Sequence, residues 1–181
     1  MQVGNKYDEP SMTIPTVHEH KAHAPRSVGC TIITCSDTRI ADTDSSGQLI
    51  QKLLKNQGHT VVEYHLVKDD PAQIQLWIAR AMTNEAVHAL IINGGTGVSR
   101  RDSTFEAVDA MLEKRLPGFG EIFRLLTYQE MGSSAIMSRA TAGIIKGRCV
   151  FSIPGSEHAV KMAMEKLILP ELGHLVQQLS K

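Results

Sequence analysis

The fold that we predict for this chain follows most clearly from the stretch VHALIINGGTGVSRRDST, residues 87–104. Its first seven residues form an apolar run rich in branched side chains, which is typical of a buried β-strand. Three glycines and a threonine follow at 94–97, then a basic pair at 100–101, then Asp102 before a helical segment that starts near Thr104. A buried strand that leads through a loop into a helix is half of a β-α-β unit, so the stretch predicts a parallel sheet covered by helices.

Outward from this stretch the same alternation continues in both directions. Apolar, β-branched runs predict further strands at 28–34, 60–67, 143–146 and 148–153. Helical spacing predicts helices around 49–54, from Pro71 onward, at 104–114, at 122–128 and at 156–167, with a kink or restart at Pro170. We therefore predict an α/β fold, a three-layer α/β/α sandwich with a mostly parallel central sheet, as a single domain over residues 27–181.

Residues 1–26 differ from the rest because they are polar and carry prolines without any hydrophobic period. We expect an N-terminal arm that is flexible or docked on a neighbouring subunit. Its His18, His20 and His23 leave two interpretations open, a metal site or an ordinary polar tail. No carboxylate or cysteine framework supports the metal site, so the polar tail is favoured.

The composition excludes several classes of protein. Nineteen basic residues balance nineteen acidic ones, which argues against nucleic acid or an anionic membrane as partner and requires any anion site to be local. No apolar stretch approaches the length of a membrane span. Three sparse cysteines are typical of reduced intracellular thiols, so we expect a cytoplasmic protein.

The glycine loop at 94–97 is the strongest candidate site, because ligands of parallel sheets bind at the carboxyl ends of the strands. Gly94, Gly95 and Gly97 allow backbone N–H groups to converge on an anion, and Thr96 lies among them. The basic pair that follows, including Arg101, adds charge for phosphate oxygens. The loop matches neither G-x-x-x-x-G-K-[ST] nor a complete G-x-G-x-x-G. A tight turn with a solvated basic pair is the alternative.

Asp102 and the pair of Asp69 and Asp70 each allow two interpretations. Asp102 beside a phosphate loop suits Mg²⁺, which takes few carboxylates and several phosphate oxygens, but it also suits a helix N-cap. Asp69 and Asp70 precede Pro71 and allow either a metal site or first-turn capping charges. Pattern alone leaves both alternatives open.

The remaining candidates lie in loops at other strand ends and helix starts. Ser36 and Asp37 end the first strand, and the neighbouring Cys35 lacks a histidine nearby in the sequence. Packing is expected for the other two cysteines and for most of the methionines. A glycine-rich loop around Phe119, a serine–arginine pair and a Pro-Gly turn complete the set: Gly118, Glu121, Ser138, Arg139, Pro154, Gly155 and Ser156.

Seven motifs in a fixed order resemble the MoaB/MogA family of molybdenum cofactor biosynthesis proteins. They are TCSDTR (34–39), DSSG (44–47), KDDP (68–71), NGGTGVSRRDST (93–104), PGFGEIFR (117–124), MSRA (137–140) and IPGS (153–156). Together they span roughly residues 28 to 175. PGFGE, SRA, PGS and the stretch YQEMGSSAI are closer to the MoaB branch.

The resemblance implies a three-layer α/β fold, a homotrimer or homohexamer, and molybdopterin as ligand. Active members transfer AMP from Mg-ATP to molybdopterin, release pyrophosphate and prepare the pterin for hand-over to a molybdate insertase. By motif position, Asp102 and Asp69 are the implied catalytic residues and Mg²⁺ ligands, although Lys68 stands where the family commonly has proline. The implied nucleotide and pterin contacts are Ser36, Asp37, Gly94, Gly95, Thr96, Gly97, Arg101, Gly118, Glu121, Ser138, Arg139, Pro154, Gly155 and Ser156.

Two other functions remain as alternatives. Some MoaB-type proteins lack the aspartate after GGTG and do not adenylate, which makes a non-catalytic molybdopterin-binding or delivery protein the main rival. Asp102 is present here, so the enzyme is favoured. A nicotinamide-dependent oxidoreductase fits the coarse α/β pattern, but the incomplete glycine fingerprint argues against it.

Overall fold

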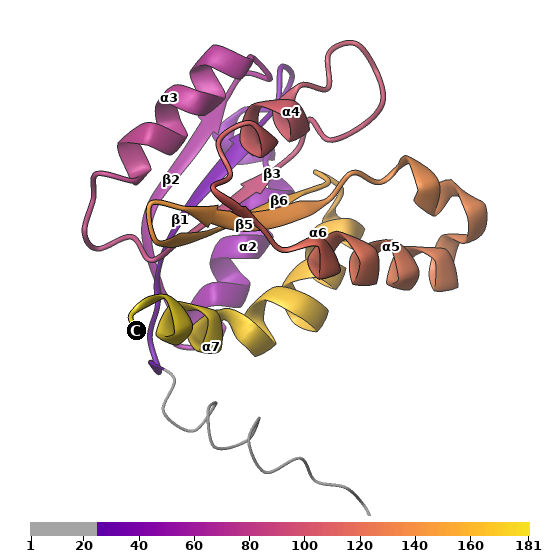
Figure 1. Ribbon diagram of the computed structural model, residues 1–181. Coiled ribbons are helices and arrows are strands. Elements are labelled where there is room, and N and C mark those ends of the chain that lie inside the picture. The colour runs from indigo at the N-terminus through magenta and orange to yellow at the C-terminus, as the bar shows by residue number, and fades with distance from the viewer. Residues whose placement is uncertain (1–24) are drawn as a thin grey trace, which may run out of the picture.

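In the computed structural model, which describes residues 25–181, a six-stranded sheet runs through the centre of the molecule (Figure 1). The strand order is β2-β1-β3-β6-β5-β4. The strands are β1 (Gly29–Cys35), β2 (Thr60–Val67), β3 (Ala89–Asn93), β4 (Lys114–Arg115), β5 (Thr141–Ile145) and β6 (Arg148–Ile153). Strands β2, β1, β3 and β6 are parallel, whereas β5 and β4 are antiparallel to their neighbours. The predicted single-domain, mostly parallel α/β fold is confirmed.

Helices cover both faces of the sheet (Figure 1). One face packs against α3 (Pro71–Ala81) and α4 (Thr104–Asp109). The other face packs against α2 (Ser45–Asn56), α5 (Pro117–Met131), α6 (Glu157–Ala163) and α7 (Leu169–Leu179). Short 3-10 turns, η1 (Ala41–Thr43) and η2 (Gly132–Met137), and the π-helical turn η3 (Met164–Ile168) complete the chain.

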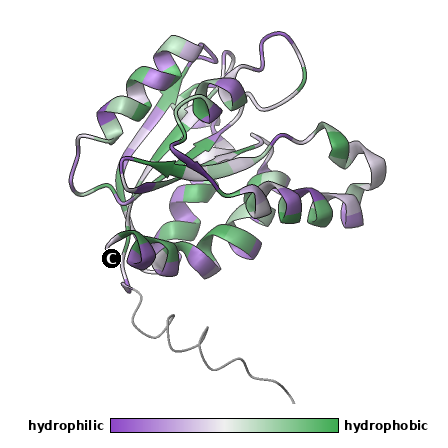
Figure 2. Cartoon of the chain, viewed as in Figure 1, coloured by the Kyte–Doolittle hydropathy of each residue, from purple (hydrophilic) through white to green (hydrophobic). Residues whose placement is uncertain are grey.

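The apolar runs of the strands divide between two cores. In β1, Cys30 and Ile32 belong to the core under α2 and α6, whereas Ile33 and Cys35 belong to the core under α3 and α4. Successive strand residues point to opposite faces, so a strand covered on both sides must be apolar throughout. The strands accordingly carry much of the hydrophobic colour in Figure 2. This is why the runs at 28–34 and 87–93 were readable as strands.

The region between residues 104 and 131 differs from the prediction. The helix expected over 104–114 ends at Asp109, because residues 114–115 join the sheet edge as β4. Backbone N–H groups of Glu113 and Leu116 bond to carbonyls of Ile144 and Ala142, which fixes this edge. The next helix begins at Pro117 rather than near 122, with its proline in the first turn, where the missing N–H has no partner to lose.

The C-terminal helices confirm the predicted restart at Pro170. A π-turn links α6 to α7, and Pro170 lies in the first turn of α7. Proline inside a continuous helix removes a hydrogen bond, and the wider turn absorbs that loss. Within residues 25–181 no helix is long and apolar enough to cross a membrane. The predicted arm and its three histidines lie outside the described residues, apart from Pro25 and Arg26, which are exposed.

Candidate functional site

A cavity of about 550 Å³ opens at the carboxyl ends of β1, β3 and β6. Three loops after these strands form one side, and helices α5 and α6 with η2 form the other. Its lining consists of Cys35, Ser36, Thr38, Arg39, Gly94, Gly95, Thr96, Gly97, Asp102, Phe123, Thr127, Met131, Met137, Ser138, Pro154, Gly155, Ser156, His158, Ala159 and Met162. The expected location of the ligand site, at the strand ends, therefore coincides with a real concavity.

The loop after β3 requires glycine at two consecutive positions. Gly94 has a φ of 104°, and a Cβ atom there would stand 2.2 Å from the carbonyl oxygen of Cys35. Gly95 has a φ of 58°, and its Cβ would stand 2.2 Å from both Asp69 Oδ2 and Thr104 Oγ1. L-residues with side chains rarely adopt such angles, so the sequence NGG places bare backbone at the cavity wall. Bare backbone of this kind is suited to anions.

The loop after β6 is held by a buried carboxylate on another element. Asp44 is fully buried at the start of α2 and accepts hydrogen bonds from Gly47 N–H at 3.0 Å and Tyr64 Oη at 2.6 Å. It also pairs with Arg39 Nη1 at 3.0 Å. Burial on its own would raise the pKa of Asp44, but hydrogen bonds from Thr34, Tyr64 and Gly47, helped by Arg39, lower it. Asp44 is therefore an ionised anchor at neutral pH.

Arg39 links the buried Asp44 to a loop of the cavity wall. Its Nη2 donates to the carbonyl of Gly155 at 3.0 Å, and Ser46 Oγ donates to the same carbonyl at 2.7 Å. Gly155 in turn lies against Gly94, since a Cβ on Gly155 would be 3.0 Å from Gly94 Cα. Two of the loops that line the cavity are thus locked to each other and to α2.

Asp102 is the acidic side chain in the lining of the cavity. Its Oδ2 accepts a hydrogen bond from the N–H of Ser99 at 2.9 Å. Hydrogen bonds from Ser99, assisted by the Gly97 N–H and the nearby Arg139, lower the pKa of Asp102. An ionised carboxylate beside a glycine loop is chemically suited to a hard cation that also contacts phosphate.

Asp69 lies behind the glycine loop rather than in the lining of the cavity. Its Oδ1 accepts hydrogen bonds from Ser103 N–H at 3.2 Å, Ser103 Oγ at 2.9 Å and Thr104 Oγ1 at 3.1 Å. It therefore braces the start of α4. Asp70 caps α3 by accepting from the N–H of Gln73 at 2.9 Å, so for this residue the capping interpretation is the correct one. The metal role of Asp69 stays a prediction.

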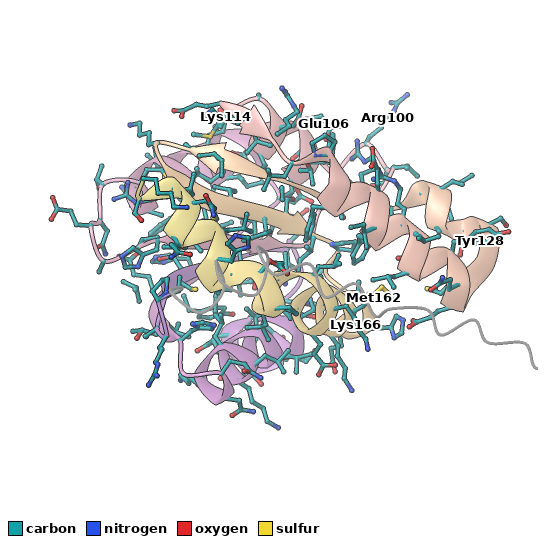
Figure 3. All side chains as sticks on the ribbon, turned by 60° about the horizontal axis from the view of Figure 1, so that its bottom comes forward. Arg100, Glu106, Lys114, Tyr128, Met162 and Lys166 are labelled. Atoms are coloured by element: carbon teal, nitrogen blue, oxygen red, sulfur yellow. The ribbon has the colours of Figure 1, made fainter. Side chains whose placement is uncertain are left out.

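The structure brings most of the other predicted site residues to the cavity. Ser36, the loop 94–97, Ser138 and the turn 154–156 all line it. Five predicted contacts do not line the cavity of the single chain: Asp37, Arg101, Gly118, Glu121 and Arg139. Asp37 Oδ1 instead accepts from the N–H of Asp69 at 3.3 Å. Gly118 lies in the first turn of α5, and Glu121 follows it on the same helix. Arg101 is exposed, and its neighbour Arg100 extends away from the body of the molecule (Figure 3).

Cys35 lines the cavity but is not suited to act as a nucleophile. Burial raises its pKa to about 12, so the reactive thiolate is absent at neutral pH. Cys30 and Cys149 are fully buried within β1 and β6, and burial raises the pKa of each to about 12. Their predicted role in packing is confirmed.

The helical side of the cavity was not predicted from the sequence. Phe123, Thr127 and Met131 are spaced four residues apart on α5, and His158 and Met162 are spaced likewise on α6. Such spacing places each set on one face of its helix. The signal was present but ambiguous, because a methionine or phenylalanine stripe is equally typical of core packing. Arg39 lay inside the quoted TCSDTR motif without being assigned a role.

Comparisons with known proteins agree with this geometry. A family model described as "Probable molybdopterin binding domain" matches residues 31–174. "Molybdenum cofactor biosynthesis protein B" of Halalkalibacterium halodurans is 52% identical over 167 residues, which cover 92% of this chain and 98% of that protein. Its counterpart in Bacillus subtilis is 50% identical over 167 residues, with 92% and 98% covered. The crystal structure of a "tungsten cofactor synthesizing protein MoaB" from Pyrococcus furiosus has 36% identity and a TM-score of 0.78, with 87% and 100% covered.

Proposed function

Because the chain belongs to the MoaB/MogA family of molybdenum cofactor biosynthesis proteins, we propose that it transfers the adenylyl group of ATP to the phosphate of molybdopterin. The products are adenylyl-molybdopterin and pyrophosphate. The pterin product is then available for hand-over to a molybdate insertase. The observation that carries the proposal is the ionised Asp102 carboxylate beside the bare backbone of the glycine loop.

The proposed reaction joins two polyanions, so positioning and charge neutralisation matter more than covalent chemistry. The molybdopterin phosphate attacks the α-phosphorus of ATP in line with the departing pyrophosphate. In the loop 94–97, the Gly94 N–H donates to the carbonyl of Ile153 and the Gly97 N–H faces Asp102, so the N–H groups of Gly95 and Thr96 would hold phosphate oxygens. Arg39 at the cavity wall adds positive charge. Ser36, Ser138 and Ser156 offer hydroxyl groups from three separate elements.

Magnesium is the cation that the site suits. Residues 25–181 contain no cluster of three or more His, Cys, Asp or Glu side chains that would form a closed metal cage. Mg²⁺ prefers one or two carboxylates together with substrate phosphates, so Asp102 is a sufficient protein contact, with Asp69 as the second candidate. When bound, the ion neutralises phosphate charge during the transfer.

The helical side of the cavity suits a flat heteroaromatic ring. Phe123 and Met162 are buried there, whereas Met131 and Met137 are about half exposed. In Figure 3, Met162 lies between α5 and the C-terminal helices. Thioethers make favourable contacts with aromatic rings and adapt to their shape. The cavity thus has a polar end for phosphates and an apolar end for the pterin or the adenine.

A non-catalytic molybdopterin-binding protein is the second candidate, because it would use the same cavity. Asp102 favours the enzyme, since binding a phosphate requires no carboxylate in the wall. Pyrophosphate release distinguishes the two functions. The enzyme releases pyrophosphate only when ATP, Mg²⁺ and molybdopterin are all present, whereas a binding protein releases none under the same conditions.

We also propose that the protein is a homo-oligomer, either a trimer or a hexamer. Ile122, Leu125 and Tyr128 repeat every three residues on α5 and are 48%, 55% and 59% exposed. Tyr128 lies on the outer side of α5 in Figure 3. A row of large apolar side chains on a helix surface is typical of a protein interface. The family implies that a second copy of the chain covers this row.

A further inference from the structure

Arg139 joins three backbone carbonyls of the loop that follows β3. Its Nε donates to the carbonyl of Thr96 at 3.1 Å, and its Nη2 donates to those of Gly97 and of Asp102, the latter at 3.2 Å. The side chain comes from the segment before β5, about forty residues further along the chain. One side chain therefore holds both ends of the loop segment 96–102.

The guanidinium is itself held from the opposite side. Its Nη1 pairs with the carboxylate of Glu106 on α4. Its Cζ lies 5.1 Å from the centre of the Phe105 ring, a cation–π distance. Only 25% of the Arg139 side chain is exposed. The planar fork is thus fixed in direction, and most of its five donors are already used by protein groups.

This arrangement sets the direction of the loop N–H groups. In a trans peptide unit the C=O and the N–H point in opposite directions. The carbonyls of Thr96 and Gly97 point at Arg139, which lies outside the cavity lining, so the N–H groups of Gly97 and Val98 point away from it. The Gly97 N–H faces the carboxylate of Asp102, which lines the cavity. Thr96 and Gly97 themselves line the cavity. The same contacts keep two electron-rich carbonyls away from an incoming anion.

We infer that Arg139 is a positioning residue: it fixes the backbone of the loop segment 96–102, and with it the Asp102 carboxylate, instead of contacting a phosphate itself. This inference rests on the proposed function insofar as that function places phosphate at the loop. It differs from the direct phosphate contact that the sequence suggested for Arg139. A direct contact requires charge, whereas positioning requires the fork, and lysine supplies only the charge.

The test compares R139K, R139Q and the control R148Q in the full-length protein. Arg148 makes a matched control because it also donates to three backbone carbonyls, those of Val87, Asn84 and Lys146, at the opposite end of the sheet. Two properties are measured, the first on ligand-free protein and the second by titration with ligand. The first is amide hydrogen exchange of residues 94–103, and the second is the affinity for inorganic pyrophosphate by calorimetry.

We expect R139K and R139Q alike to speed exchange in residues 94–103 and to weaken pyrophosphate binding by about tenfold or more. R148Q should leave both measurements unchanged even if it lowers the thermal midpoint. Wild-type affinity in R139K would overturn the inference in favour of a charge contact. Unchanged exchange in the loop, or pyrophosphate that fails to bind the wild-type protein, would overturn it as well. Neither measurement needs turnover, so absence of AMP transfer contradicts the proposed function alone.

Discussion

The carboxylate of Asp69 lies directly against the backbone of Gly95: a Cβ atom at Gly95 would stand 2.2 Å from Asp69 Oδ2. The same Cβ would also stand 2.2 Å from Thr104 Oγ1. The glycine loop, the loop after β2 and the start of α4 therefore meet at one point that has room only for a hydrogen atom. Replacement of Gly95 should displace all three.

For Gly95→Val we expect loss of pyrophosphate affinity by about tenfold or more and a fall in the free energy of unfolding of about 2 kcal/mol. The reasons are the positive φ and the collision with Asp69. Calorimetry and urea denaturation measure the two effects. Gly147→Ala is the control, because Gly147 has a φ of 72° but nothing within 4 Å of its Cβ. That variant should lose some stability and keep its affinity; equal affinity in both variants would contradict the assigned role of the loop.

Asp102→Asn should reduce the rate of AMP transfer by about 100-fold or more. The carboxylate contributes several kcal/mol of charge stabilisation, and ~1.4 kcal/mol corresponds to a tenfold change in rate. Molybdopterin affinity should stay within about twofold, since asparagine keeps the shape and can still accept from the Ser99 N–H. Pyrophosphate release and pterin fluorescence quenching measure the two quantities. Normal turnover in this variant would remove the metal role from Asp102.

The buried Asp44 should make stability dependent on pH in a defined direction. Its pKa is lowered from the ordinary 3.8, so its contribution is present above pH 3.8 and is lost as the pH falls through the lower folded-state pKa. Asp44→Asn should therefore cost about 2 kcal/mol at pH 7, because hydrogen bonds to an ionised group are weakened, and progressively less in acid. Urea denaturation at pH 7 and pH 3 measures the difference.

Asp42→Asn is the control for this experiment, because Asp42 is exposed and only two residues away. It should change stability by less than about 0.5 kcal/mol at either pH. If Asp44→Asn cost as little as Asp42→Asn at pH 7, the buried network would not hold the Gly155 turn.

The exposed row on α5 predicts the behaviour of a charged variant. Leu125→Glu should convert the proposed oligomer to a species near the chain mass of 19.9 kDa, because a buried unpaired carboxylate is costly in an interface. Light scattering after size exclusion measures the mass. Leu76→Glu is the control, since Leu76 is also half exposed but lies on α3. A variant Leu125→Glu that keeps the wild-type mass would place the interface elsewhere.

The sheet and the polar half of the site were predictable from the sequence, because buried strands are apolar throughout and glycine has a specific backbone use. NGG at 93–95 marked the loop for that reason. The short strand β4 was not predictable, since its two exposed residues, Lys114 and Arg115, carry no strand pattern and pair only through β5. The roles of Asp44 and Arg139 were equally hidden, because each depends on contacts between residues distant in the sequence.

Transfer of label from ATP is the most direct test of whether the cavity joins AMP to molybdopterin. The protein is incubated with molybdopterin, Mg²⁺ and ATP labelled at the α-phosphate, and the pterin fraction is counted. If the cavity catalyses the transfer, label appears on the pterin in step with pyrophosphate release, and none appears when Mg²⁺ is omitted. A pterin fraction that binds tightly to the protein but stays unlabelled would contradict it.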